Sequence, residues 1–369
     1  MSPPRSRSSR VAATGPISFA EFVEWALYDP DRGFYAAGTG TAGRRGDFLT
    51  SPEVGPLFGA VVAGALDAWW EELGRPDQFT VVEAAAGTGA MARSVLAHRQ
   101  LGCREALRYI AVERSRSMRD QLEGIGPPVE VADRMPDARF VGVVLANELL
   151  DNLPFDLYEF RDADGWHEVR VVQEADGSWT EQLVPGDAEA EAWARSAAPD
   201  ASDRARIPRQ RAAAAWLTDA LDRLERGRVV VFDYADTTSS MARRPTAEWL
   251  RTYRQHARGA HPLVDPGSQD ITCEVAIDQL AAVATPDRDR RQAAWLTDHG
   301  IDALVEDGKR IWHERAHLGD LEAIRARSRV IEAEALRDPT GLGAFHVLEW
   351  EVGGRVRRGG CGSRRQRRV

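Results

Sequence analysis

The chain is predicted to be an α/β protein built around a parallel sheet, and three stretches of the sequence indicate this fold class. Residues 79–91, FTVVEAAAGTGAM, have the pattern of a strand, a tight glycine turn and the start of a helix. Residues 108–113 form a second strand-like stretch that again ends on an acidic residue. Residues 141–146, VGVVLA, are almost continuously apolar, which is typical of a parallel strand covered by helices on both faces.

The glycine turn of the first strand predicts a ligand site. Gly87 and Gly89 allow the backbone to turn tightly and let a ligand approach the main chain closely, and the following helix offers free N–H groups at its start. Together with Ala92 these glycines also match a dinucleotide fingerprint. A glycine-rich turn of this kind can also serve packing alone. The turn by itself therefore does not identify a ligand.

The segment before this strand is expected to hold two helices and a long loop. Residues 17–27 have apolar residues at helical spacing, with Ser18 expected to cap the helix, and residues 28–36 form a turn with aromatic residues on both sides. Residues 38–55 are polar and rich in glycine, and loops of that length are commonly functional. A helix is expected to begin at Ser51, with Pro52 in its first position.

The segment after it alternates strands, helices and an insertion. A third strand at residues 129–132 is followed directly by Asp133, and the strand at 141–146 runs into NELLDNLP, residues 147–154. Alternating residues and Asp-Gly turns predict an inserted β-meander over 155–180. A fifth parallel strand at 228–233 and a last strand at 345–352 complete the expected sheet.

Charge is distributed unevenly along the chain. Residues 1–10 carry three arginines and residues 353–369 carry seven, without an acidic residue in either, and both tails are expected to be disordered. The remaining chain has 38 basic residues, 48 less those ten, against 57 acidic residues. Because so acidic a surface repels phosphates, we expect no nucleic-acid partner.

Cysteine usage and hydropathy suggest a protein of a reducing compartment. The three cysteines have no CxxC spacing, so neither a disulfide framework nor a metal site is expected. No apolar run approaches about 18 residues, so no membrane span is expected. We therefore predict a cytoplasmic protein. Its oligomeric state is left open.

Acidic residues follow several of the predicted parallel strands. Because parallel strands end at one edge of a sheet, these side chains should surround one crevice. They are Glu83, Glu113, Asp133 and Glu148, with Asn147 beside them. Such a crevice suits a cationic ligand without phosphate better than a dinucleotide, so S-adenosylmethionine, which carries a sulfonium, is the expected cofactor. No residue pattern for hydride transfer is evident.

The order of motifs along the chain resembles the MidA-type methyltransferases, over residues 18–350. The motifs are GDFLTSPEVGPLFG, the turn E-x-x-x-G-x-G, NELLDNLP, FDYA, DPGSQDIT and GLGAFHVLEW. The resemblance implies a Rossmann-like class I methyltransferase fold, with a mostly parallel seven-stranded sheet, helices on both faces, a helical N-terminal cap and an inserted lobe. It also implies protein-arginine methylation linked to the assembly of respiratory complex I, as in the family's mitochondrial member.

The resemblance assigns roles to individual residues. It implies that Glu83, Gly87, Gly89 and Glu113 contact the cofactor, and we add Asp133 on its position after a strand. It places six residues in a loop over the cofactor, namely Gly46, Asp47, Phe48, Ser51, Pro52 and Glu53. It further implies that Asn147, Glu148 and Asp151 face the methyl group, and we expect the two carboxylates to orient a guanidinium and accept its proton.

Two departures from the family pattern affect these expectations. The first glycine of the turn is replaced by Ala85, whose methyl group can narrow the approach of the cofactor. Ala235 follows the Asp-Tyr pair where the family favours glycine. Two alternatives stay open at this point: methylation of a small molecule, and an assembly chaperone that keeps the methyltransferase fold with weak catalysis.

The sequence predicts four regions. Residues 1–16 are a basic tail, and residues 17–76 form the helical cap and glycine-rich loop. Residues 77–352 form the methyltransferase domain, with insertions at about 155–210 and 240–300, and residues 353–369 form the second basic tail.

Overall fold

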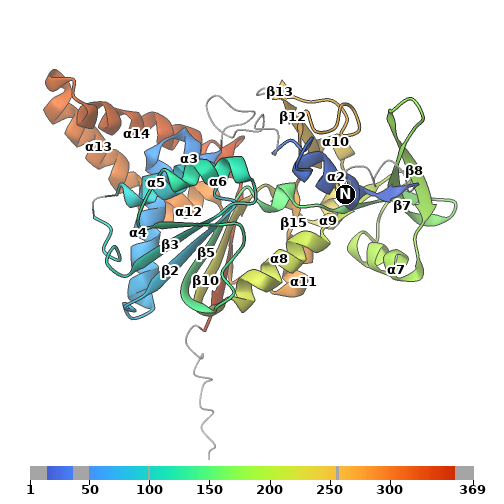
Figure 1. Ribbon diagram of the computed structural model, residues 1–369, viewed down its shortest axis with the longest axis horizontal. Coiled ribbons are helices and arrows are strands. Elements are labelled where there is room, and N and C mark those ends of the chain that lie inside the picture. The colour runs from blue at the N-terminus through green and yellow to red at the C-terminus, as the bar shows by residue number, and fades with distance from the viewer. Residues whose placement is uncertain (1–14, 36–49, 99, 255–256, 354–369) are drawn as a thin grey trace, which may run out of the picture.

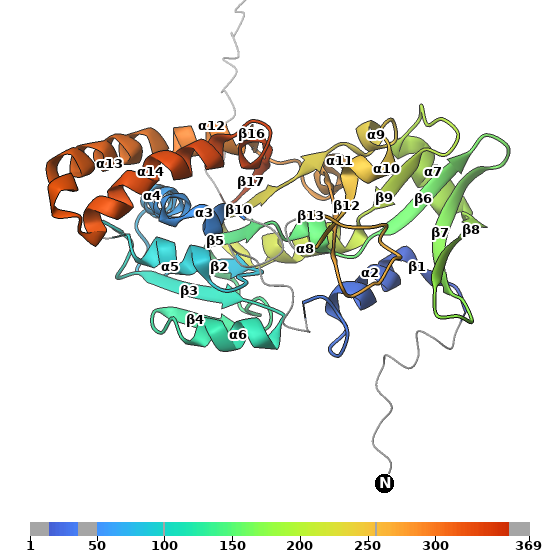
Figure 2. The ribbon, with the colours of Figure 1, turned by 90° about the horizontal axis from the view of Figure 1, so that it is seen from above.

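The computed structural model describes residues 15–35, 50–98, 100–254 and 257–353. Gly46, Asp47 and Phe48, predicted to lie over the cofactor, are outside these ranges, and so are most of the predicted glycine-rich loop and both basic tails. The predictions for them therefore remain predictions. Figures 1 and 2 show an elongated molecule, with the large sheet and its helices at one end and an inserted lobe at the other.

The centre of the larger end is a seven-stranded, mostly parallel sheet, as predicted. Its strand order is β16-β17-β10-β5-β2-β3-β4. All neighbours from β10 to β4 pair in parallel, whereas β17 is antiparallel to both β10 and β16. The bounds are β2 (Phe79–Ala84), β3 (Leu107–Val112), β4 (Val129–Ala132), β5 (Phe140–Asn147), β10 (Leu224–Asp233), β16 (Arg288–Arg291) and β17 (His346–Val352).

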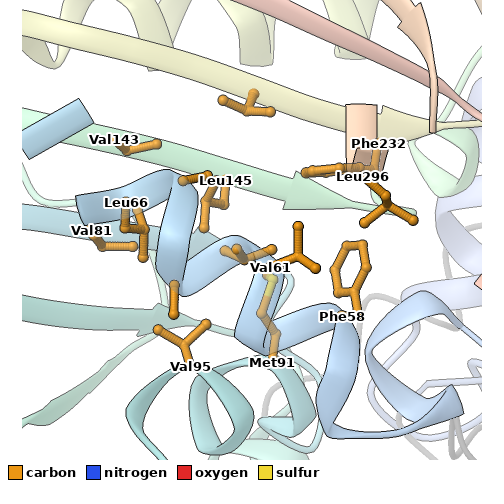
Figure 3. Packing of buried hydrophobic residues seen from close by; sticks show 14 of the residues in the cluster. Phe58, Val61, Leu66, Val81, Met91, Val95, Val143, Leu145, Phe232 and Leu296 are labelled. Atoms are coloured by element: carbon orange, nitrogen blue, oxygen red, sulfur yellow. The ribbon is translucent and has the colours of Figure 1, made fainter. Parts of the chain in front are cut away.

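Helices cover both faces of this sheet. One face is covered by α4 (Pro56–Glu72), α5 (Ala90–Leu96), α12 (Gln292–Asp298), α13 (Ile301–Arg315) and α14 (Leu321–Arg337). Figure 3 shows how Val61 and Leu66 of α4 approach Val81, Val143 and Leu145 of the sheet. On the other face lie α8 (Arg211–Asp222) and α11 (Ile277–Val283), and α6 (Arg116–Glu123) lies beside β4. Burial on both faces explains the continuous apolar run in β5.

The inserted lobe is largely antiparallel. Its main sheet contains β1 (Ile17–Ser18), β6 (Asp156–Arg161), β7 (Gly165–Gln173), β8 (Trp179–Pro185) and β9 (Arg206–Arg209), with α7 (Ala188–Ala197) packed beside it. Short elements connect the lobe to the large sheet: β11 (Ala235–Asp236), β12 (Leu250–Arg254), β13 (Ala257–Arg258), β14 (Asp270–Cys273), β15 (Val275–Ala276), α9 (Thr238–Met241), α10 (Thr246–Trp249) and the 3₁₀ turn η1 (Leu150–Asn152). Two further 3₁₀ turns, η2 (Ala316–Leu318) and η3 (Leu342–Ala344), contact α12, α13 and α14 at the other end of the molecule.

The helices of the N-terminal region lie in two different hydrophobic clusters. α2 (Phe19–Tyr28) begins at Ser18, whose hydroxyl accepts from the backbone of Glu21 in a capping box, and it packs with lobe residues such as Phe155. α4 packs against the large sheet instead. Between them, α3 (Ser51–Val54) has Thr50 as its cap, so Ser51 occupies the first helical position that we had predicted for Pro52. The regional boundaries themselves remain a prediction.

Three further features concern the described residues. No helix in the described ranges is long and apolar enough to cross a membrane. Cys103 and Cys273 are buried and free. Among the residues that the structure describes, no group of three or more His, Cys, Asp or Glu side chains is placed to hold a metal ion.

Gly142 tests the packing of the central strands. A Cβ atom at this position of β5 would lie 1.8 Å from the carbonyl oxygen of Thr80 in β2, and both strands are paired with a neighbour on either side. We expect Gly142→Ala to lower the free energy of unfolding by more than about 4 kcal/mol. The control is Gly64→Ala on α4, where no atom lies within 4 Å of the added carbon. In urea unfolding, the Gly64→Ala protein should be as stable as the wild type or more stable by about 1 kcal/mol. Equal effects of the two substitutions would contradict the close packing at Gly142.

Candidate active site

A pocket of about 620 Å³ lies at the carboxyl ends of the parallel strands, where nucleotide-like ligands bind in open α/β sheets. Its walls come from the turns after β2, β3, β4 and β5, from α3, and from the segment that follows α2. The predicted site residues that line it are Pro52, Glu53, Glu83, Gly87, Glu113, Asp133, Asn147 and Glu148. These predicted residues therefore line a single pocket.

The glycine turn has the backbone geometry that the sequence predicted. Gly87 has φ 54° and Gly89 has φ 82°, both in the left-handed region that favours glycine. A Cβ atom on Gly89 would also come within 2.5 Å of Ile125 and 2.7 Å of Leu122, so this glycine lets α6 and its end pack closely. Gly89 caps α5 and does not itself line the pocket.

Ala85 adopts a backbone conformation that suits glycine. Its φ is 56°, which costs a residue with a side chain roughly 1–2 kcal/mol relative to glycine. The residue is exposed towards the pocket and lines it. The departure from the family pattern therefore has an energetic cost. The methyl group of Ala85 also lies at the wall of the pocket.

Glu113 connects two of the turns that surround the pocket. Its Oε2 accepts a hydrogen bond from the backbone N–H of Gly87 at 2.9 Å, and its Oε1 accepts from the N–H of Ser115 at 2.7 Å. Burial raises the pKa of Glu113, and the N–H donors from Ser115 and Gly87 oppose this shift. The carboxylate is therefore fixed in place at the end of β3, where an acidic residue can accept from ribose hydroxyls.

Glu83, at the start of the glycine turn, is almost completely buried. It is 3% exposed, and its Oε2 accepts a hydrogen bond from the hydroxyl of Tyr109 at 2.6 Å. Burial raises the pKa of Glu83 to about 7, while the Tyr109 hydroxyl lowers it. Asp133, by contrast, is exposed, although it lines the same pocket.

Glu148 lies at the start of the NELLDNLP turn in a strained conformation. Its φ is 50°, which is uncommon for a residue with a side chain and occurs most often at functional sites. Its Oε1 accepts from the side-chain amide of Asn147 at 3.1 Å and from the N–H of Ser51 at 3.4 Å. Burial, and next the charge of Asp151, raise the pKa of Glu148 well above its usual range.

Asp151 is buried beside this carboxylate but does not line the pocket. The turn that carries it is held by Asp233, whose Oδ2 accepts from the N–H groups of Leu150 at 3.0 Å and Asp151 at 3.3 Å. Burial, with the charges of Asp233 and Asp270, raises the pKa of Asp151 well above its usual range. Asp233 and Asp270 belong to the FDYA and DPGSQDIT motifs, to which the sequence analysis gave no role.

Within α3, the predicted residues divide into two groups. Pro52 and Glu53 line the pocket, and burial raises the pKa of Glu53. Ser51 does not line it: its side chain is fully buried and its hydroxyl donates to Oε1 of Gln292 at 3.0 Å. The structure thus gives Ser51 an anchoring contact, and the predicted cofactor contact stays a prediction.

Several pocket residues were not predicted from the sequence. They come from the segment after α2, from the turns after β3 and β5, and from α8: Tyr28, Tyr35, Arg114, Asn152 and Trp216. The sequence does draw attention to the two tyrosines, because aromatic residues flank the turn at 28–36. It does not draw attention to Trp216, since this residue lies on an ordinary amphipathic helix far along the chain.

The charges of the pocket fit S-adenosylmethionine. Five of the eight charged residues that line it are acidic, and burial is the largest cause of the raised pKa values of Glu53, Glu83, Glu113 and Glu148. A buried carboxylate is stabilised in its ionised form by a nearby positive charge. A sulfonium would supply that charge without introducing phosphates.

Comparison with known proteins identifies the family. Residues 61–293 match the family model described as "Putative S-adenosyl-L-methionine-dependent methyltransferase". A protein of Burkholderia thailandensis, crystallised with S-adenosylhomocysteine, superposes with a TM-score of 0.81 at 27% identity, over 95% of this chain and 91% of that one. The native structure of a Burkholderia thailandensis protein of the same superfamily gives 0.77, with the same identity and coverage.

Two curated relatives are protein arginine methyltransferases by name. The mitochondrial NDUFAF7 homologue of Drosophila melanogaster is 27% identical over 311 residues, which are 75% of this chain and 68% of that protein. The human mitochondrial protein is 26% identical over 191 residues, 44% of this chain and 43% of that protein. The predicted cytoplasmic location is wrong by this comparison, since these relatives are named as mitochondrial and cysteine usage does not separate two reducing compartments.

The chain belongs to this family of S-adenosylmethionine-dependent methyltransferases. The predicted fold class and cofactor are thereby confirmed.

Ala85 provides a test of the cofactor turn. Ala85→Gly removes the energetic cost of the left-handed backbone conformation and the methyl group that lines the pocket. We expect tighter binding of S-adenosylmethionine in calorimetry, and an unfolding free energy higher by up to about 1 kcal/mol, since the flexibility of glycine in the unfolded chain offsets part of the gain. Weaker cofactor binding by the variant would show that the methyl group of Ala85 contributes to the site.

Proposed function

We propose that this methyltransferase methylates a nitrogen of a protein arginine side chain. The observation that carries the proposal is the pair of acceptor groups at the NELLDNLP turn. Asn147 and Glu148 both line the pocket, Asn147 Oδ1 accepts no hydrogen bond from the described residues, and the hydrogen bonds that Glu148 accepts from them all go to its Oε1. A guanidinium presents N–H donors in a planar fork that suits two such neighbouring oxygens.

The acceptor chemistry explains why carboxylates are needed. An arginine guanidinium keeps its proton in proteins, and its nitrogen lone pairs are delocalised. A group that accepts a proton as the new N–C bond forms is therefore required. Glu148 is our candidate, with Oε2 as the accepting atom and Oε1 held by Asn147 and Ser51.

The neighbouring residues would set the protonation of Glu148. Burial, and next the negative charge of Asp151, raise the pKa of Glu148, so Glu148 becomes a stronger base than an ordinary glutamate. A bound guanidinium would offset this charge and favour the ionised carboxylate before transfer. When bound, S-adenosylmethionine supplies an electrophilic methyl group on a sulfonium, and the remaining contribution of the protein is positioning.

The acceptor protein belongs to the proposal as well. The names of the relatives as protein arginine methyltransferases support a protein substrate. The resemblance to the MidA family supports, as a finer proposal, a subunit of respiratory complex I. For Asp151, whose carboxylate is buried away from the pocket, we propose an electrostatic role through Glu148.

Transfer of a labelled methyl group tests this function. The protein is incubated with methyl-labelled S-adenosylmethionine and a cell lysate, and the protein fraction is then hydrolysed to amino acids. We expect label in methylated arginine with the wild type and none with Glu148→Gln, which should still bind S-adenosylmethionine within about threefold because Glu148 holds the acceptor. Label in small molecules would contradict the proposed acceptor, and unchanged transfer by Glu148→Gln would contradict the role of Glu148. The control Glu334→Gln, on an exposed position of α14, should behave as the wild type.

The pH dependence of transfer tests the raised pKa of Glu148. Only the ionised carboxylate accepts a proton, so activity should rise with pH and reach its plateau above the raised pKa. The acid limb of the rate profile is therefore expected well above the value of about 4.3 for an ordinary glutamate. Initial rates at subsaturating cofactor and acceptor, from pH 5 to 9, measure it, because kcat/KM follows the pKa values of the free enzyme. An acid limb at the ordinary value would contradict a buried general base.

A further inference from the structure

A segment that lines one side of the pocket has no role in the function derived so far. We call residues 28–35, from the end of α2 onwards, the tyrosine strap. The rings of Tyr28 and Tyr35 stack at 5.6 Å between centroids with 22° between planes, and both residues line the pocket. Their hydroxyl groups point away from solvent into hydrogen bonds with other elements.

The main chain of the strap is attached to the cofactor side of the pocket. The hydroxyl of Ser115 donates to the carbonyl oxygen of Tyr35 at 3.1 Å. The N–H of the same serine donates to Glu113 Oε1 at 2.7 Å. Since Glu113 is placed to receive ribose hydroxyls, a ligand that orders this carboxylate also orders the attachment of the strap.

The side chains of the strap are attached to the turn that carries the proposed base. The hydroxyl of Tyr35 lies 3.1 Å from Asn152 Oδ1 and 3.0 Å from Asp270 Oδ1, and the hydroxyl of Tyr28 donates to the carbonyl oxygen of Asn152 at 3.2 Å. The amide of Asn152 donates to Asp270 Oδ1 at 3.1 Å and to the carbonyl of Ile271. Asn152 closes η1, four residues after Glu148.

The strap itself is built to keep its shape. Asp29 Oδ1 accepts from the N–H groups of Asp31 and Arg32 at 3.0 Å each, and the N–H of Tyr35 donates to the carbonyl of Leu27. Gly267 lies against the turn so closely that a Cβ atom there would be 2.3 Å from the carbonyl oxygen of Arg32. Burial raises the pKa of Tyr35 well above its usual range, so its hydroxyl stays a donor. A rigid strap can transmit a displacement from one end to the other.

We propose that Tyr35 is a positioning residue that couples cofactor binding to the order of the η1 turn. Its carbonyl is held from the end of β3, and its hydroxyl holds Asn152 at the end of β5. Cofactor binding at Glu113 then restrains η1 and the Glu148 carboxylate that precedes it. Without the Tyr35 hydroxyl, Asn152 Oδ1 becomes a buried acceptor without its donor, which typically costs about 1–3 kcal/mol.

Hydrogen exchange with and without S-adenosylmethionine tests the coupling. In the wild type, the cofactor should slow amide exchange in residues 148–153 as well as in 113–117. Tyr35→Phe keeps the stacked ring and removes only the hydroxyl, and Ser115→Ala removes the contact at the other end of the strap. For each variant we expect cofactor affinity within about threefold of the wild type, protection of 113–117 retained, protection of 148–153 lost, and a methyl-transfer rate about tenfold lower.

The control is Tyr158→Phe, which removes a hydroxyl from a buried tyrosine in the lobe cluster that contains Trp193. It should change neither the exchange pattern nor the transfer rate. Retained protection of 148–153 in Tyr35→Phe would overturn the proposal. So would a general loss of thermal stability and cofactor affinity in both strap variants, since that is the result of a purely structural role.

The inference rests on the proposed role of Glu148 only for its catalytic consequence. The exchange measurement needs no acceptor, so an acceptor other than arginine would leave the coupling result unaffected. Conversely, if coupling fails while label still enters arginine, the proposed function stands and the strap does not contribute to it.

Discussion

The site depends on a constraint of parallel sheets: all parallel strands end at the same edge, so the acidic residues that follow them share one small volume. Here the turns after β2, β3, β4 and β5 bring Glu83, Glu113, Asp133 and Glu148 around a single pocket. Burial of Glu83, Glu113 and Glu148 is unfavourable for their ionised forms and raises their pKa values. A positively charged ligand offsets that cost, which makes a sulfonium cofactor the natural occupant.

Elements outside the sheet complete the walls of the pocket at this acidic edge. α3 supplies the N–H of Ser51 to Glu148, and the buried Ser51 hydroxyl ties α3 to Gln292 of α12. The tyrosine strap lines the pocket and forms hydrogen bonds with both Ser115 and Asn152. The strap begins at the end of α2, and α2 packs in the same hydrophobic cluster as lobe residues such as Phe155. The lobe is therefore part of the site.

How much the sequence predicts depends on how local each feature is. The strand at 129–132, the acid at the end of β3 and the glycine turn follow from local pattern, and the structure places them as expected. Burial of Asp151 away from the pocket depends on Asp233, about 80 residues later, and could not be read from the NELLDNLP motif. The contact between Tyr35 and Asp270 joins residues 235 positions apart, which single-sequence pattern cannot reveal. The positive φ of Ala85 could be anticipated only because glycine is expected there.

Proton release on ligand binding tests the central claim most directly. If buried carboxylates form a site for a cation, S-adenosylmethionine should ionise them and release protons at pH 7, as measured by calorimetry in buffers of different ionisation enthalpy. S-adenosylhomocysteine, which lacks the sulfonium charge, should bind with a smaller release. Equal proton release for the two ligands, or binding of a dinucleotide in place of S-adenosylmethionine, would contradict the account.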